Sequence, residues 1–390
     1  MTNSLLGKMN KRLADIKPSD IRAFDEKVST VPGMLKLTLG EPDFHTPEHV
    51  KAAGIKAIEN NETQYAPSNG TQGLKEAAAD FIDRHYNLHY SADETIITVG
   101  ATESLYTVFA SILNEGDEVL VPTPTFPLYF ADISVNGGIP VFINTASNGF
   151  VLTPEMLDEA FKAHSNVKAI MLNYPSNPTG VTYSRDEVKA LADYLADKDI
   201  FVVADEIYSE ITYDQRHTSI AEFLPEKTIL INGASKSHAM TGWRIGTINA
   251  PLEITRELGK IHQFTVTAAG TMNMAAAEEA FKNGYDDGTE MKKEYQKRRD
   301  YLVDSLSELG FTCAKPTGAF YLFVRIPAEM QQDSFKFCYD LADRVKLALI
   351  AGAAFGPGGE GYVRLSYAAS MADLKEAVKR LAEYKKMILG

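Results

Sequence analysis

The stretch NGASKSHAMTGWRIG, which runs from Asn232 to Gly246, is the most informative part of the sequence. An apolar run that we predict to be a strand ends at Asn232, and small residues lead from there to Lys236. Small neighbours allow a planar ring to lie against the backbone beside a reactive lysine. Arg244 carries a planar guanidinium group that can bind two oxygens of one phosphate. A lysine in a loop rich in glycine and serine is by itself usually a surface residue, so the interpretation depends on the rest of the chain.

An alternating pattern of strands and helices surrounds this stretch, from Asp93 to about Ala250. The predicted strands are Thr95–Val99, Glu118–Pro122, Pro140–Asn144, Ala169–Asn173, Ile200–Ala204, Thr228–Asn232 and Ile245–Asn249. The helices predicted between them include Glu103–Leu113, Pro154–Ala163 and Arg185–Lys198. Strands that are apolar on both faces and joined by helices indicate a mostly parallel sheet with helices on both sides. Ligands bind such sheets at the carboxyl ends of the strands.

A different pattern follows a long charged helix predicted at Glu290–Leu309. The later apolar runs are Phe311–Lys315, Ala319–Ile326, Lys346–Ile350 and Tyr362–Ala368, followed by a helix at Met371–Ile388. This pattern indicates a smaller α+β domain, and a chain of 390 residues usually forms two domains. We expect residues 45–288 to form the large domain. Residues 1–44 and 289–390 are expected to form the small domain and the N-terminal segment.

The composition excludes several classes of protein. A hydrophobic content of 45% supports a globular core, and a net charge of −13 disfavours nucleic acid and membrane surfaces as partners. Cys313 and Cys338 have neither metal-type nor disulfide spacing, and we expect no metal site. The N-terminus lacks the apolar core of a signal peptide, and the longest apolar run, Leu347–Phe355, is too short to span a bilayer. These features predict a cytoplasmic protein.

The complete stretch from Asn232 to Gly246 resembles the lysine-attachment signature of the class I and II aminotransferases, which are pyridoxal-phosphate enzymes of fold type I. The resemblance implies the α/β fold of the aspartate aminotransferase-like, pyridoxal-phosphate-dependent transferases. In that fold a mostly parallel seven-stranded sheet has helices on both faces, and a smaller α+β domain is attached. It also implies that pyridoxal 5'-phosphate is held as a Schiff base on Lys236, with Arg244 on its phosphate.

Other motifs of this family occur in order along the chain. In Ala204-Asp205-Glu206-Ile207-Tyr208, the resemblance implies that Asp205 pairs with the protonated ring nitrogen of the cofactor. It implies that Tyr208 donates a hydrogen bond to the cofactor's phenolic oxygen. Asn177, in the motif Asn-Pro-Thr-Gly, is expected to contact the same oxygen and the substrate.

The remaining cofactor contacts are also implied by the resemblance. Ala101 and Thr102 stand at a predicted helix start near Thr102, where free backbone N–H groups bind phosphate. Phe126 would stack on the pyridine ring. The sequence departs from some family members at Gly233, where they carry a phosphate-binding hydroxyl, and Ser235 is the candidate that replaces it. Tyr65 is expected to reach the phosphate of the neighbouring subunit, which implies a homodimer.

Two further residues are expected to bind the substrate. Arg364 lies in the apolar run Tyr362–Ala368, where an arginine is costly unless it is paired. The family uses an arginine here to hold the α-carboxylate of the substrate. Gly40, in the segment Leu39–Phe44, matches a glycine whose backbone contacts the same carboxylate.

The resemblance implies an aminotransferase that moves the amino group of an L-amino acid to a 2-oxo acid such as 2-oxoglutarate. Ping-pong kinetics are expected, with the amine of Lys236 as general base. Segments 19–24, 37–44 and 235–240 look most like bacterial aromatic-amino-acid aminotransferases. Aspartate and N-acetyl-diaminopimelate aminotransferases remain alternatives. No motif supplies a second arginine for a distal carboxylate, and Arg22 is a candidate only by its place in the N-terminal segment.

Two alternatives remain from other classes. A pyridoxal-phosphate C–S β-lyase has the same fold and the same lysine, and the geometry that separates it from an aminotransferase is not visible in a sequence. Some transcription regulators carry an aminotransferase-like module that binds the cofactor without turnover. In those proteins a DNA-binding domain comes first, and this chain reaches its Leu39–Phe44 motif too early to contain one.

Overall fold

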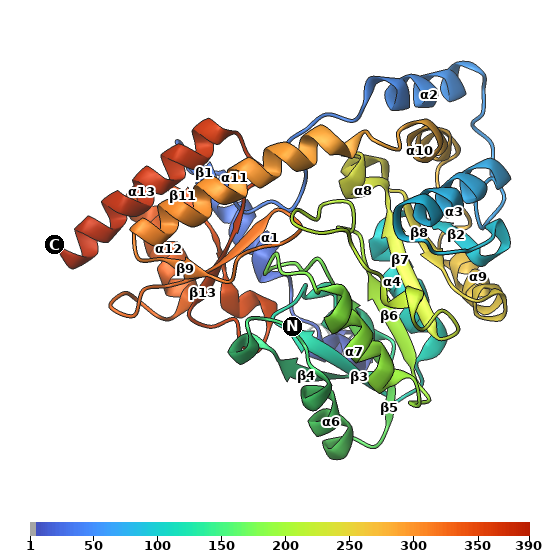
Figure 1. Ribbon diagram of the computed structural model, residues 1–390, viewed down its shortest axis with the longest axis horizontal. Helices are drawn as coiled ribbons and strands as arrows, with labels where there is room; N and C mark the ends of the chain where they lie inside the picture. The colour runs from blue at the N-terminus through green and yellow to red at the C-terminus, as the bar shows by residue number, and fades with distance from the viewer. Residues whose placement is uncertain (1–4) are drawn as a thin grey trace.

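The computed structural model describes residues 5–390, and residues 1–4 of the predicted small domain lie outside this range. Two sheets dominate the chain, and they lie side by side (Figure 1). The long helix α11 (Gly288–Glu308) runs from the larger part to the smaller one. The C-terminal helix α13 (Met371–Leu389) lies at the end of the smaller part.

The larger sheet has seven strands. Their spatial order is β2 (Thr95–Thr98), β8 (Gly246–Asn249), β7 (Thr228–Gly233), β6 (Phe201–Asp205), β5 (Val167–Asn173), β3 (Glu118–Thr123) and β4 (Ile139–Asn144). Only β8 runs antiparallel to its neighbours, and every other pairing is parallel. The predicted mostly parallel, seven-stranded sheet is therefore confirmed.

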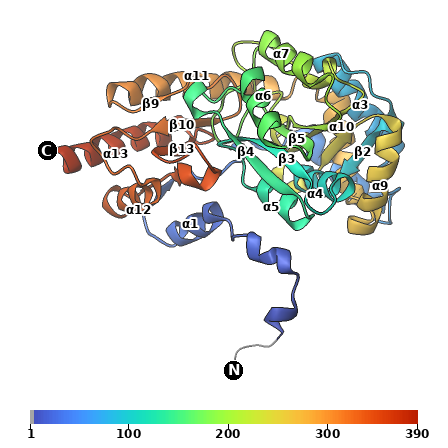
Figure 2. The same cartoon turned by 90° about the horizontal axis from the view of Figure 1, so that it is seen from below.

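Helices cover both faces of this sheet (Figure 2). One face carries α4 (Gly100–Ile112), α5 (Leu128–Val135) and α9 (Leu252–Val266). The other carries α3 (Gln72–Tyr86), α6 (Pro154–Ala163), α7 (Arg185–Leu195) and α10 (Thr271–Asn283), and α2 (Glu48–Glu59) packs on α10. Side chains of β5 alternate between the two cores, with Ala169 and Met171 on the α4 side and Ile170 and Leu172 on the α3 side. Both faces are buried, as expected for a strand that is apolar throughout.

The smaller part is built on a four-stranded antiparallel sheet. Its order is β12 (Ile350–Ala351), β13 (Tyr362–Ser366), β10 (Tyr321–Arg325) and β9 (Thr312–Cys313). It packs with α1 (Asp20–Ser29), α12 (Ser334–Val345) and α13. The single strand predicted at Lys346–Ile350 is split. Its first half, β11 (Leu347–Ala348), pairs with β1 (Leu35–Lys36), and Leu349 is where the chain passes into the other sheet.

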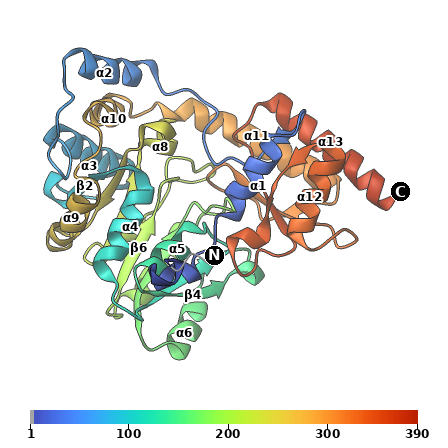
Figure 3. The same ribbon diagram turned by 180° about the vertical axis from the view of Figure 1, so that it is seen from behind.

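The N-terminal segment extends away from the smaller sheet (Figure 3). Its short helix η2 (Lys11–Asp15) lies against α5 of the larger part, and Arg12 forms an ion pair with Glu115. This segment therefore contacts both parts of the chain. Across residues 5–390, no helix is both long enough and apolar enough to cross a bilayer.

Candidate active site

Three neighbouring strands of the larger sheet end at the same edge. Asn173 is the last residue of β5, Asp205 of β6 and Gly233 of β7. Asn173 and Asp205 are direct partners across the ladder, and Asn173 Nδ2 donates a hydrogen bond of 2.9 Å to Asp205 O. The carboxyl edge of the sheet thus carries an amide, a carboxylate and, one turn beyond Gly233, Lys236.

The carboxylate of Asp205 is 4% exposed and forms no salt bridge within residues 5–390. Its Oδ2 accepts a hydrogen bond of 2.8 Å from Tyr129 Oη, and its Oδ1 accepts one of 3.2 Å from Ile207 N. Burial raises the pKa of Asp205 to about 6, although both hydrogen bonds act in the opposite direction. A buried carboxylate of this kind is stabilised by a cation that is brought to it, such as a protonated ring nitrogen.

Lys236 lies on the single-turn helix α8 (Ala234–Ser237), and its Nζ donates a hydrogen bond to Gly40 O. Nζ also lies 5.6 Å from the centre of the Tyr208 ring and 5.8 Å from that of Phe320. Burial, together with the nearby cations Arg244 and Arg364, lowers the pKa of the Lys236 ammonium to about 8, although the charges of Glu41 and Asp205 act in the opposite direction. About half of the amine is therefore unprotonated at pH 8, and the unprotonated amine is the form required of a nucleophile or a base.

An anion site lies where β2 leads into α4. The helix begins at Gly100, two residues earlier than predicted, and its N-cap Val99 makes no side-chain capping bond, so backbone N–H groups remain free. The guanidinium of Arg244 lies against this helix start. A Cβ added to Gly100 would be 2.4 Å from Arg244 Nη2, and one added to Gly246 would be 2.5 Å from Gly100 C. Ala101 stands in the same turn. The left-handed φ of Gly100, 76°, and the close backbone approach at Gly246 require glycine at both positions, and the helix start and Arg244 face one small site.

A second anion site surrounds Arg364 of β13, which is 3% exposed. Its Nη1 donates a hydrogen bond of 2.9 Å to Asn177 Oδ1, and its Nη2 donates one to Thr38 O. Its Nε is buried without a partner. Because the guanidinium is buried, its pKa is lowered, and an added anion would stabilise the charged form.

The other two buried arginines among residues 5–390 already have carboxylate partners. Arg298 pairs with Asp43 at 2.8 Å, and Arg299 pairs with Asp214 at 3.0 Å. Arg364 forms no salt bridge within the described chain. It is therefore the one buried arginine there that is left for the carboxylate of a ligand.

Tyr321 and Tyr129 belong to the site, although no motif in the sequence selects them. Tyr321 Oη and Tyr208 Oη are hydrogen bonded at 2.7 Å, and the Tyr321 ring lies 4.7 Å from the Arg364 guanidinium. A Cβ on Gly40 would come within 2.3 Å of Tyr321 Oη, so glycine is required for this close approach. Both tyrosines are buried, and their contacts join residues far apart in the chain, which explains why no local motif reveals them.

The remaining predicted site residues differ in their burial and in their contacts with the residues described above. The Phe126 ring is partly buried and lies edge-to-face with Tyr129 at 5.9 Å. Ser235 is buried beside Lys236, and Thr102 is exposed on the first turn of α4. The side chain of Tyr65 is 91% exposed on the connection between α2 and α3. Arg22 is exposed on α1, where its backbone N–H is capped by Ser19 Oγ, and its side chain forms no salt bridge within residues 5–390.

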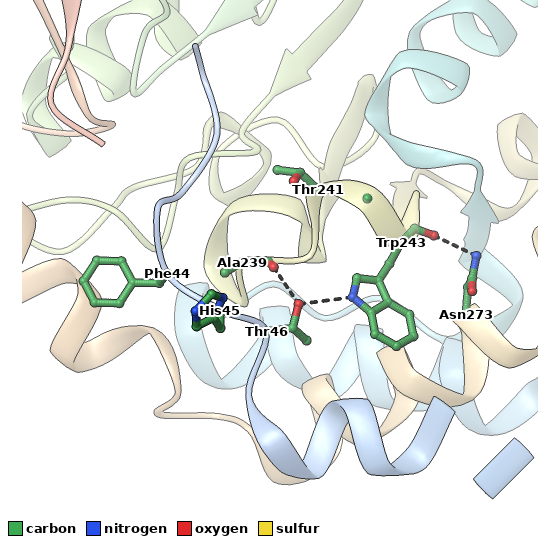
Figure 4. Close-up of a pocket in the computed structure, with 8 residues that line it drawn as sticks. Phe44, His45, Thr46, Ala239, Thr241, Trp243 and Asn273 are labelled. Atoms are coloured by element: carbon green, nitrogen blue, oxygen red, sulfur yellow. Dashed lines mark hydrogen bonds between the residues drawn. The ribbon is translucent and has the colours of Figure 1, made fainter. Parts of the chain in front are cut away.

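A pocket of about 400 Å³ adjoins the loop that joins Lys236 to Arg244 (Figure 4). Thr46 is the hydrogen-bonding centre of its wall. Its Oγ1 donates to Ala239 O at 2.8 Å and accepts from Trp243 Nε1 at 3.1 Å. Asn273 Nδ2 in turn donates to Trp243 O at 3.0 Å. The two bonds of Thr46 connect the loop between Lys236 and Arg244 to the segment that leads from the smaller part of the chain into α2.

Comparison with known proteins gives the same class. The family model "Aminotransferase class I and II" matches residues 32–381, so the chain belongs to that family. A probable N-acetyl-LL-diaminopimelate aminotransferase of Bacillus subtilis is 44% identical over 96% of this chain and 94% of that protein. The Thermus thermophilus aspartate aminotransferase with maleate has a TM-score of 0.91 at 35% identity, covering 96% of this chain and 99% of that one. An aromatic aminotransferase from Pyrococcus horikoshii has a TM-score of 0.88 at 34% identity, covering 93% and 99%.

This family depends on pyridoxal phosphate, and the site fits that group. The free helix start with Arg244 suits its phosphate, and the buried carboxylate of Asp205 suits its ring nitrogen. The lowered pKa of Lys236 suits an amine that reacts with an aldehyde. Arg364 remains for the carboxylate that every amino acid and 2-oxo acid carries. The chain is an aminotransferase enzyme.

Proposed function

We propose that the amino donor is an L-amino acid with an aromatic side chain and that the acceptor is a 2-oxo acid such as 2-oxoglutarate. The observation that carries this proposal is the single carboxylate clamp. Arg364 is the one buried arginine of residues 5–390 without a carboxylate partner, so the distal carboxylate of a dicarboxylic donor, like that of 2-oxoglutarate as acceptor, has no buried arginine of its own and must be met by an exposed group. Around this clamp the side chains are aromatic, with Tyr208, Phe320 and Tyr321 in mutual contact.

The proposed chemistry assigns a task to each residue. Pyridoxal phosphate supplies a protonated ring that withdraws electrons from the substrate's Cα. Arg364 holds the substrate carboxylate, and Lys236 Nζ removes the proton from Cα. Asp205 keeps a proton on the ring nitrogen, and Tyr208 Oη donates to the phenolic oxygen. Asn177 Oδ1 accepts from Arg364, which leaves its Nδ2 to donate to that same oxygen.

A dicarboxylic donor, N-acetyl-diaminopimelate or aspartate, is the second candidate. It is supported by the relative in Bacillus subtilis, whose name specifies the first of these substrates, and by the aspartate aminotransferase structure. On this alternative, an exposed arginine such as Arg22 or a residue of a second subunit would meet the distal carboxylate.

A panel of donors distinguishes the candidates. The chain loaded with pyridoxal phosphate is assayed with phenylalanine, tyrosine, aspartate and N-acetyl-diaminopimelate, each with 2-oxoglutarate and then with pyruvate. The proposal predicts that kcat/KM for phenylalanine and tyrosine exceeds that for aspartate by at least about tenfold, the effect of roughly 1.4 kcal/mol in binding the transition state. A preference for either dicarboxylic donor refutes it. Release of pyruvate and ammonia from cystathionine without an acceptor would reveal a β-lyase activity.

We also infer that two copies of the chain form the active unit, with Tyr65 reaching the phosphate of the partner's site. The support is two exposed aromatic side chains on neighbouring segments of the chain. Tyr65 is 91% exposed and Phe264 is 89% exposed. Their segments are joined by a hydrogen bond of 2.8 Å between His262 Nε2 and Ser68 O. Large exposed aromatic side chains that lie close together are typical of an interface. Sedimentation should give twice the 42.9 kDa of one chain.

A further inference from the structure

The hydroxyl of Tyr129 has one hydrogen-bond partner within residues 5–390, the carboxylate of Asp205. Tyr129 is 1% exposed and stands at the start of α5, three residues after Phe126. Its Oη donates to Asp205 Oδ2 at 2.8 Å, and its ring lies edge-to-face with Phe126. One short segment therefore supplies both an aromatic ring beside the cofactor site and a donor to the buried carboxylate.

The charge of Asp205 depends on opposing influences. Burial favours the neutral carboxyl, as does the charge of the adjacent Glu206. The Tyr129 hydroxyl, the Ile207 N–H and the Lys236 ammonium favour the carboxylate. Of the two direct donors, the hydroxyl forms the shorter bond, 2.8 Å against 3.2 Å. Hydrogen bonds to a charged acceptor are shorter and stronger than those between neutral groups. Tyr129 is itself so deeply buried that its pKa lies well above the usual value, so it remains a donor.

We propose that Tyr129 is a positioning residue that keeps Asp205 ionised and oriented towards the cofactor's ring nitrogen before the cofactor arrives. This inference rests on the role proposed above for Asp205. The hydroxyl and the Ile207 N–H each occupy one carboxylate oxygen, which fixes the plane of the carboxylate. A ring N–H then meets an acceptor that is already charged and needs no reorientation.

The direct test measures the titration of Asp205 in the full chain without cofactor. NMR of ¹³C-labelled aspartate, with Asp205→Asn used to assign the signal, should give a midpoint near 6 in the native chain. In Tyr129→Phe the midpoint should rise by about 1 to 2 pH units, as expected for the loss of one hydrogen bond to a charged group. An unchanged midpoint in a folded variant overturns the proposal, whatever the substrate proves to be.

A second measurement is the affinity for pyridoxal phosphate as a function of pH. At pH 7 the Tyr129→Phe chain must first lose a proton from Asp205, so its affinity should be about two- to tenfold weaker than that of the native chain. The difference should disappear by about pH 9, where Asp205 is ionised in both chains. A loss of affinity that is the same at every pH would mean a merely structural role, and would refute the inference.

The matched control is Tyr183→Phe. Tyr183 is also a buried tyrosine, at 7% exposed, but its hydroxyl accepts from Leu152 N instead of contacting Asp205. This variant should leave both the titration midpoint and the pH profile unchanged. In an Asp205→Asn background, Tyr129→Phe should have no further pH-dependent effect on cofactor affinity. If that background itself binds the cofactor normally, the role of Asp205 fails, while the titration of the cofactor-free chain still tests Tyr129.

Discussion

Arg364 Nη1 and Asn177 Oδ1 are hydrogen bonded at 2.9 Å, although 187 residues separate them in the chain. The bond joins the smaller sheet, which carries Arg364, to the turn that follows β5 of the larger sheet. It orients the guanidinium and at the same time fixes which end of the Asn177 amide is the acceptor. The proposed substrate clamp and the proposed contact to the phenolic oxygen are thus joined by this one hydrogen bond.

The first prediction concerns this clamp. Replacement of Arg364 by lysine keeps the positive charge but removes the forked donor that reaches Asn177 and Thr38 together. We expect kcat/KM to fall by about 10²- to 10³-fold, equivalent to roughly 3–4 kcal/mol for two charge-assisted hydrogen bonds. The KM should rise for the amino acid and for the 2-oxo acid alike, since both carry the same carboxylate. Cofactor affinity, measured by fluorescence titration, should stay unchanged. An effect on only one of the two substrates would contradict the assignment.

The second prediction follows from the pKa of Lys236, which burial lowers to about 8. The cofactor-free chain should capture pyridoxal phosphate faster as the pH rises, by about tenfold per pH unit below 8, and the rate should level off above 8. A free lysine side chain such as Nα-acetyl-lysine should continue to accelerate towards pH 10. Stopped-flow absorbance follows both reactions.

A matched variant sharpens this test. The charge of Glu41 raises the pKa of Lys236, so Glu41→Gln should move the midpoint of the rate profile to lower pH. Lys236→Ala should remove both the capture and the visible absorption of the bound cofactor, and with them nearly all turnover. A rate profile that continues to rise beyond pH 9 would show that the amine is not perturbed.

The sequence predicted the parts of this molecule that depend on local pattern. The seven strands follow from short runs that are apolar on both faces, and Asp205, which ends one of them, is identified through its family motif. The contact between Tyr129 and Asp205 spans 76 residues, and nothing near either residue indicates it. In the same way, the change of sheet at Leu349 depends on which partner strand is in reach of each half of an apolar run. Such features are decided by tertiary packing, which periodicity does not encode.

The third prediction concerns the stability of the cofactor-free chain. The pKa of Asp205 is higher in the folded chain, at about 6, than the ordinary value of 3.8. Its ionisation therefore opposes folding. The resulting loss of stability is absent below about pH 4 and reaches its full value above about pH 6. Asp205→Asn removes the ionisation. The difference in free energy of unfolding between the variant and the native chain should therefore grow in favour of the variant by on the order of 2 kcal/mol when the pH is raised from 4.5 to 7. Urea denaturation at the two pH values measures this gain, and activity should be lost in the same variant.

The fourth prediction tests whether Tyr65 serves the partner's site. We expect Tyr65→Ala to weaken cofactor affinity, and Lys236→Ala to be inactive, when each variant is made alone. When the two variants are expressed together, a mixed dimer contains one site with an intact Lys236 and an intact Tyr65 from the other chain. Random pairing makes about half of the dimers mixed, each with one complete site, so about a quarter of the native number of sites should regain native cofactor affinity. If Tyr65 instead serves its own subunit, both sites of the mixed dimer are defective and no site regains native cofactor affinity.

Phe264, which is almost as exposed as Tyr65, provides the control. Phe264→Ala should weaken the dimer in sedimentation experiments. When it is expressed together with Lys236→Ala, the number of sites with native cofactor affinity should match that obtained when a native chain is expressed with Lys236→Ala.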